Sequence, residues 1–185
     1  MAIRHFLSLT MMVLLTVGAP AGAGQGSLRL DPLFQALRAT TDAAYAESVE
    51  EHIWDLWLDN PNAEMIRVMR AGVLSFNSDD YVAALAAFDA VVALDPTYAE
   101  GWNKRASAHY MLGQHRAAAE DLRRALSLEP RHFGALTELG LVYLAVDQPA
   151  AALRAFEAAL AINPHLDKVR QQADALRRTK VGVAL

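Results

Sequence analysis

The apolar and polar residues of this chain recur at helical spacing over most of its length. After residue 64, amphipathic stretches alternate with short segments rich in Gly, Asp, Asn and Pro. Apolar residues at helical spacing indicate helices that bury one face, and the short polar segments indicate turns between them. The pattern predicts an all-α chain of helical hairpins, with turns at 77–80, 112–115 and 146–149.

The same helix ending occurs three times at equal spacing. The stretches VVALDP, RALSLEP and ALAINP place prolines at positions 96, 130 and 164. Proline disfavours the helical region for the residue before it, which predicts helix ends at Asp95, Glu129 and Asn163. A fixed period of roughly 20 to 50 residues is typical of a solenoid. Three units follow from this period: 65–98, 99–132 and 133–166.

The residues of the three units match one repeat pattern in register. The third unit matches best, with Leu136, Leu139, Gly140, Tyr143, Ala152, Phe156 and Pro164. The second has Trp102, Ala106, His109, Ala118, Leu122 and Pro130, and the first has Val68, Ala71, Gly72, Ser75, Ala84, Phe88 and Pro96. These residues resemble the tetratricopeptide repeat (TPR) family, whose pattern is W-x2-L-G-x2-Y, then A-x3-F, then P. The resemblance implies a right-handed superhelical solenoid of helix hairpins.

Small residues recur at two positions of the repeat. Gly72, Ala106 and Gly140 share one position, and Ala84, Ala118 and Ala152 share the other. One repeat cannot bury its own apolar face, so its stability depends on stacking against its neighbours. We therefore expect helices to cross closely at these positions, with the gaps filled by Phe88, Leu122 and Phe156.

The segments that flank the three units are also predicted to be helical. The segment 24–64 is interpreted as an N-terminal helical cap or degenerate repeat, and 167–185 as a capping helix and tail. Trp54 and Trp57 lie on an apolar stripe that is expected to pack against the first repeat; an exposed interaction helix is the alternative. The apolar positions of the C-terminal helix are Leu166, Val169, Ala173 and Leu176.

The segment 1–23 has the order of a secretory signal peptide. A basic start with Arg4 precedes an uncharged apolar run at 6–17, and small residues follow in A-x-A spacing. The run is shorter than the roughly 20 residues that span a bilayer, which disfavours a membrane anchor. We expect export to a bacterial periplasm and no membrane span after cleavage.

Composition narrows the classes of partner and site. The chain has no cysteine, which excludes disulfides and thiolate metal sites, and its net charge of −4 disfavours nucleic acid and anionic membranes as ligands. No catalytic motif and no helical histidine pair is present, so neither enzymatic activity nor a metal or other cofactor is expected. Charge is uneven: the segment 24–64 holds eight acids and two bases, and 167–185 holds two acids and five bases.

Two local features leave alternatives open. Arg105 stands where the TPR pattern usually has Leu; its stem packs while its head reaches solvent, or it pairs with an acid such as Asp121. Arg131 and His132 lie at a repeat junction, where a phosphate or carboxylate could bind near a helix N-terminus; a capped, solvated loop is the favoured interpretation.

The family resemblance also implies where a partner would bind. The first helices of successive TPRs line a concave groove that holds peptide segments of partner proteins. The stripe that would face the groove here is Met69, Val73, Phe76, Asn103, Ser107, Tyr110, Thr137, Leu141 and Leu144. Some members hold a C-terminal carboxylate with Lys, Asn and Arg. The matching positions are Met69, Val73, Lys104, Gly134 and Glu138, of which only Lys104 fits.

These features together predict a non-catalytic adaptor or scaffold in the periplasm that binds an apolar or helical segment of another protein. The alternative is a self-associating structural module, a homo-oligomer. In that case the acidic N-terminal helices would meet the basic tail, or Trp54 and Trp57 would form a dimer face.

Overall fold

The computed structural model describes residues 28–60 and 62–182, which form helices and no strand. The predicted signal peptide at 1–23 lies outside the described residues. No helix of the described part has the length and apolar character needed to cross a bilayer. The helices are α1 (Leu30–Ala39), α2 (Ala43–Leu58), α3 (Ala63–Asn77), α4 (Tyr81–Leu94), α5 (Ala99–Met111), α6 (His115–Leu128), α7 (Phe133–Ala145), α8 (Pro149–Ile162) and α9 (Asp167–Gly182).

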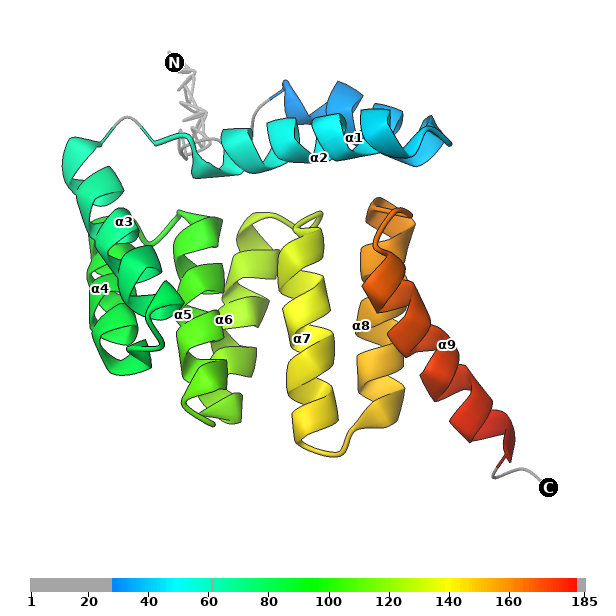
Figure 1. Ribbon diagram of the computed structural model, residues 1–185. Helices are drawn as coiled ribbons and strands as arrows, with labels where there is room; N and C mark the ends of the chain where they lie inside the picture. Colours follow the sequence, from blue (N-terminus) through cyan, green and yellow to red (C-terminus); the bar gives the residue numbers. More distant parts are fainter. Residues whose placement is uncertain (1–27, 61, 183–185) are drawn as a thin grey trace, which may run out of the picture.

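The helices α3 to α8 form three antiparallel hairpins that stand side by side, and α9 packs on α8 (Figure 1). The predicted turns are confirmed, and each contains one residue with positive φ: Asp79 at 61°, Gly113 at 72° and Asp147 at 55°. These positions recur at the same interval as the three prolines. Aspartate is among the few non-glycine residues that enter the left-handed region readily, so the turn is the same in all three hairpins.

The second helix of each hairpin ends at the residue before the proline, as predicted. Asp95, Glu129 and Asn163 have ψ angles of 93°, 94° and 96°, which place them in the extended region. The proline ring disfavours helical geometry at these residues, and the chain turns there into the next first helix.

Close helix crossing at the small residues is also confirmed. A Cβ atom added to Gly72 would lie 2.5 Å from the ring of Phe88, and Phe156 covers Gly140 in the same way in the third hairpin. Ala106 and Leu122, at the matching positions of the second hairpin, are fully buried. The repeat period therefore corresponds to one packing arrangement that occurs three times.

The helices α1 and α2 do not stack in series as a preceding repeat. They run across the ends of the hairpins, above α5 to α9 in Figure 1. Leu30, Phe34, Ile53 and Trp57 share one buried core with Phe133 and other residues of the third hairpin and α9. The expectation that the tryptophan stripe packs against the first repeat is therefore wrong, because helical spacing identifies a buried face and says nothing of the surface that buries it.

The two ends of the hairpin array differ. At the C-terminal end, the predicted apolar face of α9 is confirmed: Val169 and Ala173 are buried, and Leu166 and Leu176 are partly buried against the same core. At the other end, α5 packs on α4, and no further helix of the described residues stacks on the α3–α4 hairpin. Large apolar side chains are exposed there: Ile66 (45%), Leu74 (62%), Val82 (69%) and Leu94 (46%).

Candidate functional site

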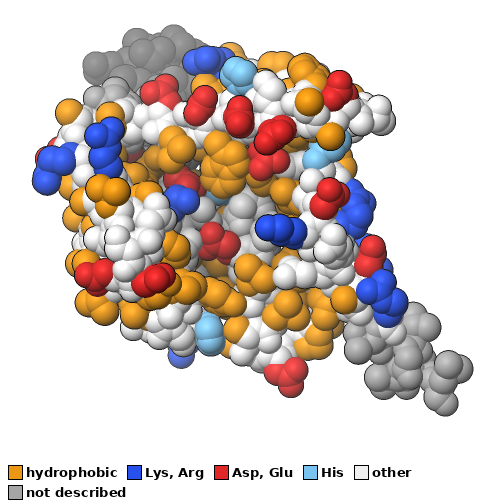
Figure 2. All heavy atoms as spheres, in the orientation of Figure 1, with side chains coloured by type: hydrophobic (Ala, Val, Ile, Leu, Met, Phe, Trp, Pro, Cys, Tyr) orange, Lys and Arg blue, Asp and Glu red, His pale blue; other side chains and the backbone are white. Residues whose placement is uncertain are grey.

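The concave face of the array holds a cavity of about 370 Å³ between α3, α5 and α7. Figure 2 shows the hollow at the centre of this face, with apolar side chains around it and charged atoms inside it. Its lining residues come from α3 to α5 and from α7: Val73, Phe76, Asn77, Phe88, Lys104, Ser107, Tyr110, Met111, Glu138 and Leu141. The first helices of all three hairpins therefore contribute to one site.

Five of the nine predicted groove residues line this cavity: Val73, Phe76, Ser107, Tyr110 and Leu141. The other four do not. Met69 and Asn103 are buried, with exposures of 8% and 1%. Thr137 donates its hydroxyl to the carbonyl of Phe133 within its own helix (2.9 Å), and Leu144 packs against the core of the third hairpin. Each predicted stripe spans about two helical turns, and only part of that length lines the cavity.

Two charged residues of the cavity are absent from the predicted groove set. Lys104 and Glu138 are one repeat period apart, so they occupy the same position in successive repeats. The hydroxyl of Ser107 lies 2.9 and 2.8 Å from the two carboxylate oxygens of Glu138. Burial raises the pKa of Glu138 to about 7, and nearby Glu100 adds to this, whereas Ser107 and Lys104 act in the opposite direction. The repeat period alone could have added Glu138 to the predicted groove set, because Glu138 lies one period after Lys104.

A buried polar network lies beneath the cavity. Glu100 has no exposed surface, and its carboxylate lies 3.2 Å from Lys104 Nζ, 2.9 Å from His132 Nε2 and 3.1 Å from Asn103 Nδ2. Burial alone would raise the pKa of Glu100, but the charge of Lys104 and the hydrogen bond from His132 together hold it below its usual value. The charge of Glu100 correspondingly raises the pKa of Lys104. The network therefore keeps an ion pair at the cavity.

His132 also connects this network to α2. Its Nδ1 accepts the backbone N–H of Ala135 (3.2 Å) and so caps α7, which leaves the proton on Nε2 for the bond to Glu100. On its other side the imidazole stacks on the indole of Trp57, at a centroid separation of 4.2 Å and an angle of 12°.

The helix α2 closes one end of the groove. Trp54 lies directly over Gly134, where an added Cβ would approach its ring to 2.7 Å. Asn163 donates to Glu50 across 2.7 Å, and His165 Nε2 lies 3.0 Å from the carbonyl of Leu37. Trp57 has no exposed surface, so the predicted dimer face made of Trp54 and Trp57 is wrong for Trp57. Trp54 is half-buried: its ring contacts Phe133 and also lines a second cavity.

The junction at 129–133 is not a free anion site. Arg131 pairs with Glu129 (3.0 Å) and with Asp31 of α1 (2.5 Å), and its guanidinium lies 4.6 Å from the ring centroid of Phe34. The alternative of an open phosphate site is therefore wrong. The loop is capped as predicted, but it is buried rather than solvated, because Glu129 and His132 have exposures of 1% and 0%. For Arg105, the predicted pairing with an acid is correct. Its guanidinium forms two hydrogen bonds of 2.7 Å to Asp121 and one of 3.0 Å to Asp89.

Comparison with known proteins agrees with this geometry. Two tetratricopeptide repeat family models match residues 72–132 and 103–167. A TPR repeat-containing protein of Rhizobium etli is 32% identical over 154 residues, which cover 83% of this chain and 76% of that protein. The chain belongs to the TPR family.

Solved TPR structures share the fold at lower identity. The crystal structure of MamA is 24% identical with a TM-score of 0.60, and the match covers 80% of this chain and 84% of that one. The first TPR of Spaghetti (RPAP3), bound to an HSP90 peptide, is 19% identical with a TM-score of 0.61 and coverage of 64% and 94%.

This TPR chain differs from carboxylate-binding members at the positions that matter for that activity. Met69 is buried, Gly134 lies under Trp54, and Glu138 places an acid where a basic or amide side chain would be needed. Lys104 is present, but its ammonium is paired with Glu100. In the part of the chain that the structure describes, no group of three or more His, Asp or Glu residues could hold a metal ion.

Proposed function

We propose that this TPR protein is a non-catalytic adaptor that binds a peptide or helical segment of a partner protein in its concave groove. The observation that carries this proposal is the open cavity between α3, α5 and α7, with its apolar walls and few polar groups. Binding sites are commonly concave, mostly apolar and supplied with a small number of placed polar groups. The related TPR of Spaghetti, whose solved structure holds a peptide, supports the same use of the fold.

The surroundings of the cavity favour a segment of limited length. The rings of Phe76 and Tyr110 remain partly exposed, so they offer apolar surface to a ligand. The helix α2 limits the groove at the end where Trp54 lies over Gly134. A short helix or extended peptide that enters from the opposite end would bury its apolar face against these rings.

Site-specific photo-crosslinking tests this proposal. We would place p-benzoylphenylalanine at Phe76 or Tyr110 in the groove, and at exposed Val82 or Leu94 on α4 as matched controls. We expect one discrete crosslinked partner from the groove positions alone. We also expect loss of that partner from pull-downs when Phe76, Tyr110 and Leu141 are changed to Ser, but not when Val82 and Leu94 are. Equal crosslinking from both faces would contradict groove binding.

We further propose that the protein acts in a bacterial periplasm. The support is the order of basic, apolar and small residues at 1–23. The absence of cysteine is compatible with this location, because disulfides are permitted in the periplasm but not required there. Mass spectrometry of the protein from a periplasmic fraction should give a chain that begins after Ala21 or Ala23. An intact start at Met1 in that fraction, or protein found only in the cytoplasm, would contradict export.

A further inference from the structure

The cavity contains a carboxylate without an ion-pair partner. Of its lining residues, Lys104 and Glu138 carry opposite charges, but the ammonium of Lys104 lies 3.2 Å from the fully buried Glu100. Glu138 accepts a hydrogen bond from the hydroxyl of Ser107 and forms no ion pair among the described residues. With Glu100 and Lys104 paired, the ionised form of Glu138 leaves the cavity one negative charge in excess.

Glu138 can accept further hydrogen bonds. Ser107 offers a single proton, for which the two carboxylate oxygens at 2.9 and 2.8 Å compete with the carbonyl of Asn103 at 3.1 Å, whereas an ionised carboxylate has about four acceptor sites. The remaining sites face a cavity whose other walls are largely apolar, among them Phe76, Tyr110 and Leu141. A ligand group that suits such walls has an apolar stem and a hydrogen-bonding cation at its end.

We propose that this cavity takes a lysine or arginine side chain of the bound partner segment, whose cationic end pairs with Glu138. The inference rests on the proposed groove function and specifies the chemistry of its ligand. The aliphatic stem would lie against Leu141, and the faces of Phe76 and Tyr110 would add cation–π attraction. An acidic side chain would instead meet Glu138, while Lys104 is already neutralised by Glu100.

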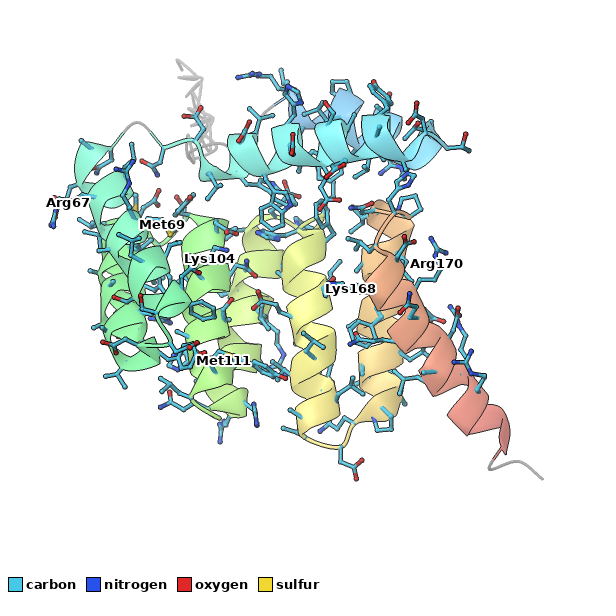
Figure 3. All side chains as sticks on the ribbon, viewed as in Figure 1. Arg67, Met69, Lys104, Met111, Lys168 and Arg170 are labelled. Carbon is cyan, nitrogen blue, oxygen red and sulfur yellow. The ribbon has the colours of Figure 1, made fainter. Side chains whose placement is uncertain are left out.

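Charge around the groove supports a cationic partner. Glu47, Glu50 and Glu51 of α2 line a second cavity, of about 680 Å³, between α2 and the start of α9, where Asp167 adds an acid and Arg170 a base. Figure 2 shows a row of acidic side chains on α2 along the edge of the hollow. Such a row attracts cations and raises their local concentration. Lys168, which Figure 3 shows on α9, does not line the cavity that contains Glu138.

The ionisation of Glu138 predicts that the affinity for a cationic ligand depends on pH. Its carboxyl has a pKa of about 7, and the charged groups that act on it are Lys104 and Glu100, both on α5. A bound cation stabilises the ionised form, so a cationic ligand should bind more tightly as the pH rises from 6 to 8. A neutral ligand of the same shape should show no such rise.

The test compares two peptides that differ in charge alone. The probes are acetyl-Ala-Leu-Arg-Leu-Ala-amide and the same peptide with citrulline, the neutral isostere of arginine, titrated into the purified protein and followed by NMR. At pH 8 we expect the arginine peptide to bind at least fivefold more tightly, with shifts at Ser107 and Glu138. The preference should shrink at pH 6 and disappear in Glu138→Gln, whereas Glu120→Gln, which changes an exposed acid on α6, should keep it.

The outcomes separate this inference from the groove function. Equal binding of both peptides at the groove would overturn the cationic assignment and leave groove binding in place. Tighter binding of a peptide with Glu in the central position would also overturn it. If neither peptide binds at millimolar concentration, the assignment falls, and the crosslinking experiment decides the groove function by itself. A dimer of the protein that the arginine peptide dissociates would assign the cavity to a second copy and overturn the assignment to a partner protein.

Discussion

The indole of Trp57 and the imidazole of His132 lie nearly parallel, with their centroids 4.2 Å apart. Trp57 comes from α2 and His132 from the junction between the second and third hairpins, so this stack joins the N-terminal helices to the repeat array. His132 in turn donates to Glu100, next to the cavity. The position of α2 is therefore linked to the polar network below the groove through a single side chain.

Removal of this stack should destabilise the protein strongly. We expect Trp57→Ala to lower the free energy of unfolding by about 3–5 kcal/mol, because a large side chain with no exposed surface leaves a cavity. Chemical denaturation followed by circular dichroism measures the change. Tyr45→Ala, on the same helix but 53% exposed, should change it by less than about 0.5 kcal/mol. Similar losses for the two variants would mean that α2 is not held by Trp57.

The pKa of Glu138 predicts an unusual dependence of stability on pH. Because its pKa is raised to about 7, the folded protein binds this proton more tightly than the unfolded chain. The stability it contributes is thus present at low pH and is lost as the pH rises from about 4.5 to about 7. Glu138→Gln should therefore gain about 1–3 kcal/mol over wild type between pH 5 and pH 8. Chemical denaturation of wild type and Glu138→Gln at pH 5 and at pH 8 measures this gain. The control Glu120→Gln should follow wild type at both pH values.

The pair of Arg105 and Asp121 predicts a strong energetic coupling. Asp121 has a side-chain exposure of 7% and accepts two bonds from Arg105, so Asp121→Ala should cost about 2–4 kcal/mol. Combining it with Arg105→Leu should cost less than the sum of the single changes, with a coupling of about 1–3 kcal/mol. The exposed pair Arg116 and Glu120 should show a coupling of at most about 0.5 kcal/mol. If the losses of stability from the two single changes simply add, Arg105 and Asp121 do not form a stabilising ion pair.

The small residues of the repeat predict sensitivity to added volume. Ala118 has no exposed surface and lies in the core of the second hairpin. Ala118→Leu should overpack this core and cost about 1–3 kcal/mol, seen as a lower Tm in a thermal scan. Ala90→Leu adds the same volume at an exposed position of α4 and should leave Tm nearly unchanged. A variant at Ala118 that melts no lower than wild type would mean that the repeat register is misplaced.

The sequence predicted the repeat array closely, because its signals are local. Proline acts on the residue before it, and the spacing of Gly72 to Phe88 recurs in Gly140 and Phe156, so each hairpin could be placed without knowledge of its neighbours. The groove was predicted in part. Phe76, Tyr110 and Leu141 were identified from the helix stripe, whereas Glu138 was considered only as a position of the carboxylate-binding set, which its acidic side chain does not fit.

By itself, the sequence determined the repeat period, the turns, the helix ends and the small residues at the crossings, since each depends on residues within one or two helical turns or on a repeated interval. Only the tertiary structure decided where α1 and α2 lie, which acids have partners, and which side chains share one cavity. Those properties depend on contacts such as Asn163 with Glu50, 113 positions apart, which no periodicity along the chain records.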